Sequence, residues 1–280
     1  MRRLIATATL AVIAASLPAA SALAQGRIVL APHKVTYDLE LGEARDGQDG
    51  KRIAMADGRL AFDFGGDACS GYTLAMRQVT RVDDGEGNRR LSDMRMTSWE
   101  EGKGKTLRFN STTYTNGQIT QQSEGAAERA QDGFSIKLRR PTPTSSDFKD
   151  LPVFPNQHMI RMIEAARRGE SIVEIKFFDG SDTGEKMYDT LAVIGREVAS
   201  GSDLRLEAPA RAAGLAGVRR WPVKLSYFEQ GQGERTPEFI MSFDLFENGV
   251  SGSLKIDFGS FLLKGGMKTL EMGKDTECKE

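Results

Sequence analysis

The chain has few of the residues that build catalytic and metal centres. Its 280 residues include two histidines and two cysteines. His33 follows Pro32, and His158 lies in the first turn of a predicted helix. Neither has a cysteine or a second histidine at the spacing of a zinc site, so we expect no metal and no cofactor. For His158 we expect a neutral imidazole that hydrogen-bonds a loop, with a ligand contact as the alternative.

The chain also lacks a long apolar run and a large excess of charge. The apolar stretch from Leu4 to Leu17 is shorter than the roughly 20 residues that span a bilayer. It lies between Arg2-Arg3 and the small-x-small sequence Ala22-Leu23-Ala24, which together predict a signal peptide over residues 1–24. Removing two arginines would take the net charge from −1 to about −3, which gives no reason to expect nucleic acid as a partner.

An exported chain folds in an oxidising compartment, where cysteines form disulfides. Two cysteines and no third predict one disulfide, between Cys69 and Cys278. Two free buried thiols are the alternative. The bridge would close a loop of roughly 200 residues, for which the chain-entropy model gives an upper value of about 5 kcal/mol.

Alternating apolar and polar residues dominate the mature chain, and this period of two is typical of strands. The clearest segments are Val35 to Leu41, Leu60 to Phe64, Tyr72 to Met76, Phe134 to Leu138, Val223 to Tyr227, Phe239 to Leu245 and Leu254 to Phe258. Asn116-Gly117 and Asn248-Gly249 lie between such segments and predict tight hairpins. We therefore expect one β-rich domain over residues 25–280, built on a large antiparallel sheet that curls, closes or splits.

One segment changes period. Pro141 to Pro155 is expected to be a loop that leads into a helix from Asn156 to Arg168, capped by the Asn156 side chain and ended by Gly169. The apolar stripe of this helix consists of Met159, Ile160, Ile163 and Ala166. We expect the stripe to pack on the concave face of the sheet. The stretch from Ala208 to Ala216 is expected to be loop, because Gly214 interrupts it.

Two short motifs match enzyme signatures but lack their context. Ser146-Asp147-Phe148-Lys149 has the Ser-x-x-Lys spacing of penicillin-binding enzymes, yet the serine lies in the proline-rich segment and the companion Lys-Thr-Gly is missing. Asp182-Thr183-Gly184 has no second copy to supply the paired carboxylate of an aspartic protease, and we expect a turn there. The sequence predicts no enzyme.

Several stretches together resemble the EipB-like family of periplasmic cell-envelope integrity proteins. They are Gly58 to Phe64 with Cys69-Ser70-Gly71-Tyr72, Phe154 to His158 with Ala165 to Gly169, Arg220 to Val223, Glu247 to Ser251, and Asp257 to Phe261. The resemblance extends over nearly all of the mature chain, including Cys278. The order and spacing of the stretches carry it, since no single one is specific.

The resemblance implies a broken, spiral-like β-sheet with a helix in its concavity and a Cys69–Cys278 disulfide. It also implies a periplasmic protein of certain Gram-negative bacteria that supports envelope integrity under stress and has no known enzymatic activity. No catalytic residue carries over, because the family is defined by an envelope role and not by a reaction.

Binding of a protein or peptide partner is the expected molecular role, because a curved sheet leaves open edges and a groove beside the helix. The expected partner surface is the helix face opposite the apolar stripe, with Gln157, His158, Arg161, Glu164 and Arg168. The alternative is a lipid or lipoprotein carrier whose concave apolar surface shields acyl chains. Met159 and Met162 would suit such an adaptable surface, or would simply be core.

Overall fold

A computed structural model describes residues 26–45, 52–201, 206–231, 236–274 and 278. The predicted signal peptide lies outside these residues. The strands are β1 (His33–Ala44), β2 (Met55–Asp67), β3 (Gly71–Asp83), β4 (Arg89–Glu100), β5 (Thr106–Thr115), β6 (Gln118–Arg129), β7 (Phe134–Arg140), β8 (Thr144–Phe148), β9 (Ile172–Phe177), β10 (Tyr188–Ile194), β11 (Arg220–Glu229), β12 (Phe239–Phe246), β13 (Ser251–Asp257) and β14 (Phe261–Met272). The helical elements are α1 (Pro155–Arg167), α2 (Ala208–Ala212) and a short 3-10 turn η1 (Leu215–Gly217).

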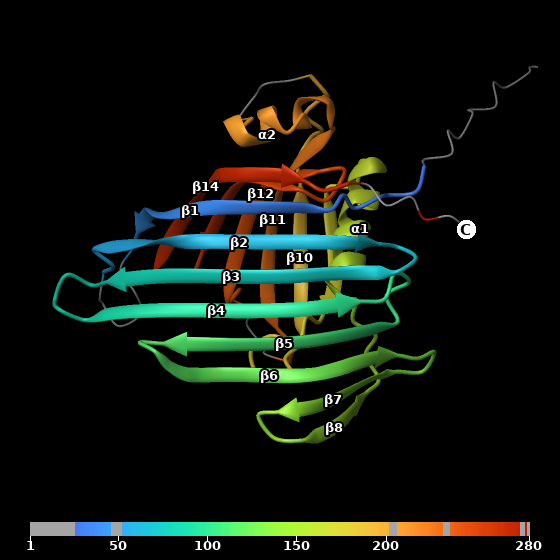
Figure 1. The fold of residues 1–280 in the computed structure, drawn as a ribbon, viewed down its shortest axis with the longest axis horizontal. Coiled ribbons are helices and arrows are strands. Elements are labelled where there is room, and N and C mark those ends of the chain that lie inside the picture. The colour runs from blue at the N-terminus through green and yellow to red at the C-terminus, as the bar shows by residue number, and fades with distance from the viewer. Residues whose placement is uncertain (1–25, 46–51, 202–205, 232–235, 275–277, 279–280) are drawn as a thin grey trace, which may run out of the picture.

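All 14 strands form one antiparallel sheet in the order β8-β7-β6-β5-β4-β3-β2-β1-β14-β13-β12-β11-β10-β9. The first and last strands pair at the centre, and β8 and β9 are the two ends of the sheet. The sheet curls so that the strands from β10 to β12 pass behind β1 to β5 at a steep angle (Figure 1). This confirms the predicted large curved antiparallel sheet, which stays open like a broken barrel.

The predicted hairpins are confirmed. Asn116 and Gly117 join β5 to β6 with φ of 51° and 81°, left-handed values that asparagine and glycine tolerate. Gly249 has φ of 87° in the turn between β12 and β13. Asp182 and Gly184 also have positive φ, and Asp182-Thr183-Gly184 is a turn.

Helix α1 connects the two ends of the sheet, since it follows β8 and precedes β9. Its predicted bounds were nearly right, but the predicted cap was wrong. Phe154 is the N-cap residue and makes no side-chain capping bond, and Pro155 occupies the first turn. The Asn156 N–H instead donates to a carboxylate of β4, a long-range partner that the local pattern could not reveal.

Two predicted loops contain regular structure. β8 lies inside the proline-rich segment, because Thr144 to Phe148 pair with β7. Ala208 to Ala216 is not simply loop: α2 and η1 lie there, separated by Gly214 with φ of 81°. Gly214 therefore divides this stretch without preventing helical turns on either side.

The helix fills one end of the concave space. The side chains of Met162, Ile163, Ala165 and Ala166 are buried in a core shared with Val35, Tyr37, Leu60, Trp221 and Leu245. The expected packing of α1 on the concave face is therefore confirmed, although Met159 and Ile160 are only partly buried. Each fully buried large apolar side chain contributes about 1.5–3 kcal/mol, so these contacts hold α1 against the sheet.

The segment after β9 crosses to the opposite wall. Phe178 joins Phe109, Phe134 and Phe154 in a second buried cluster. Gly180 lies against the ring of Phe109, where a Cβ atom would come within 2.2 Å of the ring. This close approach requires glycine, and it brings polar residues of the segment into the concave space.

Candidate functional site

The concave space that α1 leaves unfilled is a cavity of about 1330 Å³. It lies between the inner faces of β2–β6 and those of β10–β14. The lining side chains include Leu60, Phe62, Met76, Gln78, Thr80, Arg90, Ser92, Met94, Met96, Thr113, Gln121, Phe177, Asp179, Asp182, Tyr188, Tyr227, Glu238, Phe239, Met241, Ile256, Phe258 and Phe261. In Figure 1 α1 lies at the end where β2 turns into β3, and the β3–β4 turn, whose residues Asp84 and Asn88 line the cavity, lies at the other end.

One wall of the cavity is an aromatic ladder that runs from the interior to the rim. Tyr188 and Tyr227 meet edge to face at 5.8 Å, and Tyr227 stacks on Phe239 at 4.3 Å. Phe239 lies 6.5 Å from Phe258, which stacks on Phe261 at 5.1 Å. Phe258 is 37% exposed, so the ladder reaches solvent. Such a surface favours an apolar occupant.

The facing wall, formed by strands β2 to β6, carries both apolar and polar side chains. Met76, Met94 and Met96 supply flexible apolar surface, and methionine adapts to occupants of different shape. Between and beside them lie the polar side chains of Gln78, Thr80, Ser92, Thr113 and Gln121. The cavity is therefore amphipathic, with apolar side chains on both walls.

The predicted partner face on α1 lies outside this cavity. Arg161, Glu164 and Arg168 are exposed, and Arg168 pairs with Glu170 at 2.6 Å. Gln157 is partly buried and its Nε2 donates to the Gly102 carbonyl at 3.2 Å. These residues do share one accessible side of the helix, and their role in binding stays a prediction.

His158 differs from the rest of that set because it is only 3% exposed. Its Nε2 lies 2.8 Å from Thr190 Oγ1, whose hydroxyl donates to the Ile175 carbonyl. The Thr190 oxygen is therefore left to accept the proton of His158 Nε2. Burial lowers the pKa of His158 to about 3, which keeps the imidazole neutral. The imidazole is neutral and structural, as expected, but its partner Thr190 lies in strand β10 and not in a loop. The buried side chain cannot belong to an exposed partner face.

The sequence interpretation missed Glu100, the last residue of β4. Its carboxylate is 1% exposed and accepts the N–H groups of Asn156 at 2.7 Å and Gln157 at 3.1 Å. It thus satisfies two of the backbone donors left open at the start of α1. Burial raises the pKa of Glu100 to about 7. No local signal marks this residue, because its partners lie 56 and 57 positions away.

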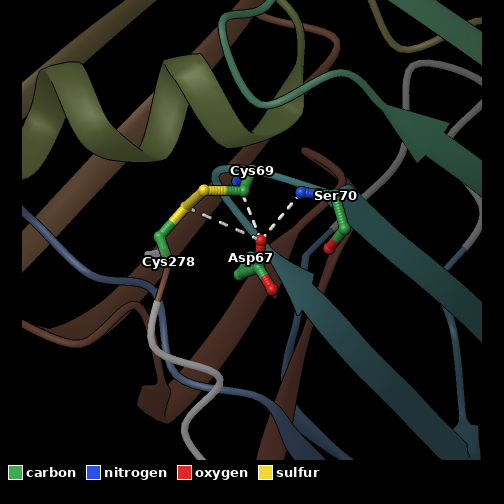
Figure 2. The surroundings of a disulfide bond; sticks show 4 residues. All are labelled: Asp67, Cys69, Ser70 and Cys278. Atoms are coloured by element: carbon green, nitrogen blue, oxygen red, sulfur yellow. Dashed lines mark hydrogen bonds between the residues drawn. A yellow bond between two sulfur atoms is a disulfide. The ribbon is translucent and has the colours of Figure 1, made fainter. Parts of the chain in front are cut away.

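The disulfide joins Cys69 to Cys278 with a Cα–Cα distance of 5.6 Å, as predicted. Figure 2 shows the bond beside Asp67, whose Oδ1 accepts the N–H groups of Cys69 at 2.7 Å and Ser70 at 2.8 Å. Asp67 and the two cysteines are close enough to suggest a metal cluster, but both sulfurs are used in the bond. The group therefore ties the C-terminal segment to the β2–β3 turn.

Among the described residues, no helix combines the length and apolar character needed to cross a membrane. The chain is 32% identical over 256 residues to the cell envelope integrity protein EipB of Brucella abortus (strain 2308), covering 91% of this chain and 88% of the relative. It is also similar to a crystal structure of a beta-barrel-like protein of domain of unknown function DUF1849 from Brucella abortus, with a TM-score of 0.78 and 30% identity. That match covers 88% of this chain and all of the other.

The EipB-like family model matches residues 24–274. This span contains every strand and helix described above, together with the cavity between the two walls. The chain belongs to the EipB-like family.

Proposed function

We propose that this protein is exported to the periplasm and supports the integrity of the cell envelope by binding an apolar chain in its interior cavity. The envelope role follows the name of the Brucella relative. The export follows the signal peptide predicted over residues 1–24. The occupant would be the acyl chain of a lipid or of a lipoprotein, as in the carrier alternative.

The cavity carries this proposal. Its volume of about 1330 Å³ exceeds the roughly 300–1000 Å³ of sites that hold drug-sized ligands. Counting about 30 Å³ for each heavy atom, the volume of a water molecule in the liquid, the cavity would hold about 40 heavy atoms. That is enough for two acyl chains. The aromatic ladder and the methionines supply the apolar contacts that such chains need.

A second candidate function is binding of a protein or peptide partner beside α1. The supporting observation is the pair of sheet ends. Within the described residues, β8 pairs only with β7, and β9 pairs only with β10 apart from one bridge between Val153 and Phe177. Open backbone groups on end strands recruit extended peptides. The exposed face with Arg161, Glu164 and Arg168 lies on the helix that joins these two strands.

We also propose that the protein is not an enzyme. Ser146 lies in β8, and its hydroxyl donates to Glu185; within the part of the chain that the structure describes, no lysine or histidine is its hydrogen-bond partner. His158 is buried and neutral. Both side chains therefore have structural partners in place of a reactive arrangement.

The test is binding of the apolar fluorescent probe N-phenyl-1-naphthylamine to the purified mature protein. We expect saturable binding, which Ser92→Trp combined with Thr113→Trp should weaken strongly, because both side chains line the cavity. The matched control is Leu91→Trp with Arg108→Trp, two exposed positions on the outer face of the same two strands. Absence of probe binding by the folded protein, or equal loss in both variants, would refute the cavity as the binding site.

A further inference from the structure

Arg90 lies on β4, is exposed, and lines the cavity at the end near the β3–β4 turn. Within the described part of the chain, its guanidinium has no hydrogen bond and no ion pair, nor is it among the residues with further interactions. Its neighbour Arg89 faces the outer side and pairs with Asp83 at 2.7 Å. Arg90 therefore presents open donors at one end of the amphipathic cavity.

The acidic residues that line the cavity have other partners. Lys186 lies between Asp182, at 3.3 Å, and Glu238. Asp84 accepts the N–H groups of Glu86 at 2.9 Å and Asn88 at 3.1 Å within its own turn. Asp182 and Glu238 thus share the charge of Lys186, whereas Asp84 is held by uncharged N–H groups.

Asp179, the remaining acidic residue of the lining, is held differently. Burial raises its pKa, which favours the neutral carboxyl, and its Oδ1 accepts the Ser181 N–H at 2.9 Å. Of the charged side chains that line the cavity, Arg90 is the one cation, and its guanidinium forms no ion pair within the described residues.

We propose that the occupant is an amphiphile with an anionic head group, which Arg90 binds at the cavity entrance while the apolar chain lies along the aromatic ladder. This inference rests on the proposed function and adds the charge of the head group. A guanidinium offers paired N–H donors in a planar fork that matches the oxygens of a carboxylate or a phosphate. The aromatic ladder provides the apolar continuation from the rim inward.

Competition against bound N-phenyl-1-naphthylamine tests the head group. The competitors are palmitate, lysophosphatidate and the neutral hexadecanol, each below its aggregation concentration. We expect the protein to bind at least one of the two anionic amphiphiles about tenfold more tightly than hexadecanol, the order of a charge-assisted hydrogen bond. Arg90→Gln should remove this preference and leave hexadecanol binding unchanged. Arg89→Gln should keep the preference, since it removes the same charge from the outer face.

The competitors also separate the possible sources of the anion. A preference for palmitate alone identifies a carboxylate head, and a preference for lysophosphatidate alone identifies a phosphate head. In either case, raising the salt concentration should reduce the preference of the unmodified protein, because an exposed charge pair is screened.

Equal affinity for all three compounds, or an unchanged preference in Arg90→Gln, would overturn the assignment of the head group while the cavity function stands. If the folded protein binds neither the probe nor any of the three compounds, the proposed function itself is overturned.

Discussion

Replacing Glu100 by glutamine should change how stability depends on pH. Glu100 is buried at the start of α1, and burial raises its pKa from 4.5 to about 7. Between these values the native protein holds a proton that the unfolded chain has lost. The free energy of unfolding must therefore fall as pH rises through this window. The shift corresponds to about 3 kcal/mol, at 1.4 kcal/mol for each pKa unit.

Glutamine at this position cannot titrate, yet its side-chain oxygen can still accept one of the two N–H groups of α1. The difference in unfolding free energy between the native protein and Glu100→Gln should therefore fall by about 3 kcal/mol from pH 4.5 to pH 7. Titration of other groups, including His158, is common to both proteins and cancels. Glu100→Ala should have an unfolding free energy about 1–2 kcal/mol below that of Glu100→Gln at every pH, because alanine leaves both N–H groups of α1 without this acceptor.

Guanidinium unfolding followed by tryptophan fluorescence at several pH values measures this difference. A difference that does not change with pH would contradict a raised pKa. A difference that grows with pH would mean that the two N–H groups hold the carboxylate ionised, which reverses the reasoning.

The remaining predictions concern the disulfide, the helix and the enzyme question. Cys69→Ser should lower the unfolding free energy by up to about 5 kcal/mol and leave the C-terminus sensitive to protease, as limited proteolysis would reveal. Ile163→Asp should unfold the domain, because an unpaired buried carboxylate costs several kcal/mol, and circular dichroism would detect the loss. Arg161→Glu with Arg168→Glu should fold normally, since both side chains are exposed; if α1 binds a partner, this variant should fail to complement an envelope-defective deletion strain. Ser146→Ala should complement fully, and covalent labelling of Ser146 by a fluorescent penicillin would contradict the non-enzymatic assignment.

The architecture was largely predictable because its signals are local. Alternation in segments such as Val35 to Leu41 and the two Asn-Gly turns depends on residues adjacent in the chain. The helical stripe of α1 and the number of cysteines also need no knowledge of distant contacts. These signals were enough for a curved antiparallel sheet, a buried helix and one bridge.

The cavity was not predictable, because its two walls come from strands far apart in the sequence. Ser92 and Thr113 face inward, whereas alternation alone would assign polar residues to the solvent side. The same limit explains the missed cap. Asn156 has the local pattern of a capping residue. The N–H groups at the start of the helix donate instead to Glu100, which lies on β4, far away in the sequence.

Native mass spectrometry of the protein purified from the periplasm tests the central claim most directly. We predict a mass above that of the polypeptide by one retained acyl amphiphile. This excess should be lost in the Ser92→Trp and Thr113→Trp variant and kept in the Leu91→Trp and Arg108→Trp control. A mass equal to the polypeptide alone, in protein that is folded and restores envelope integrity, would contradict the cavity-binding account and favour a protein or peptide partner at α1.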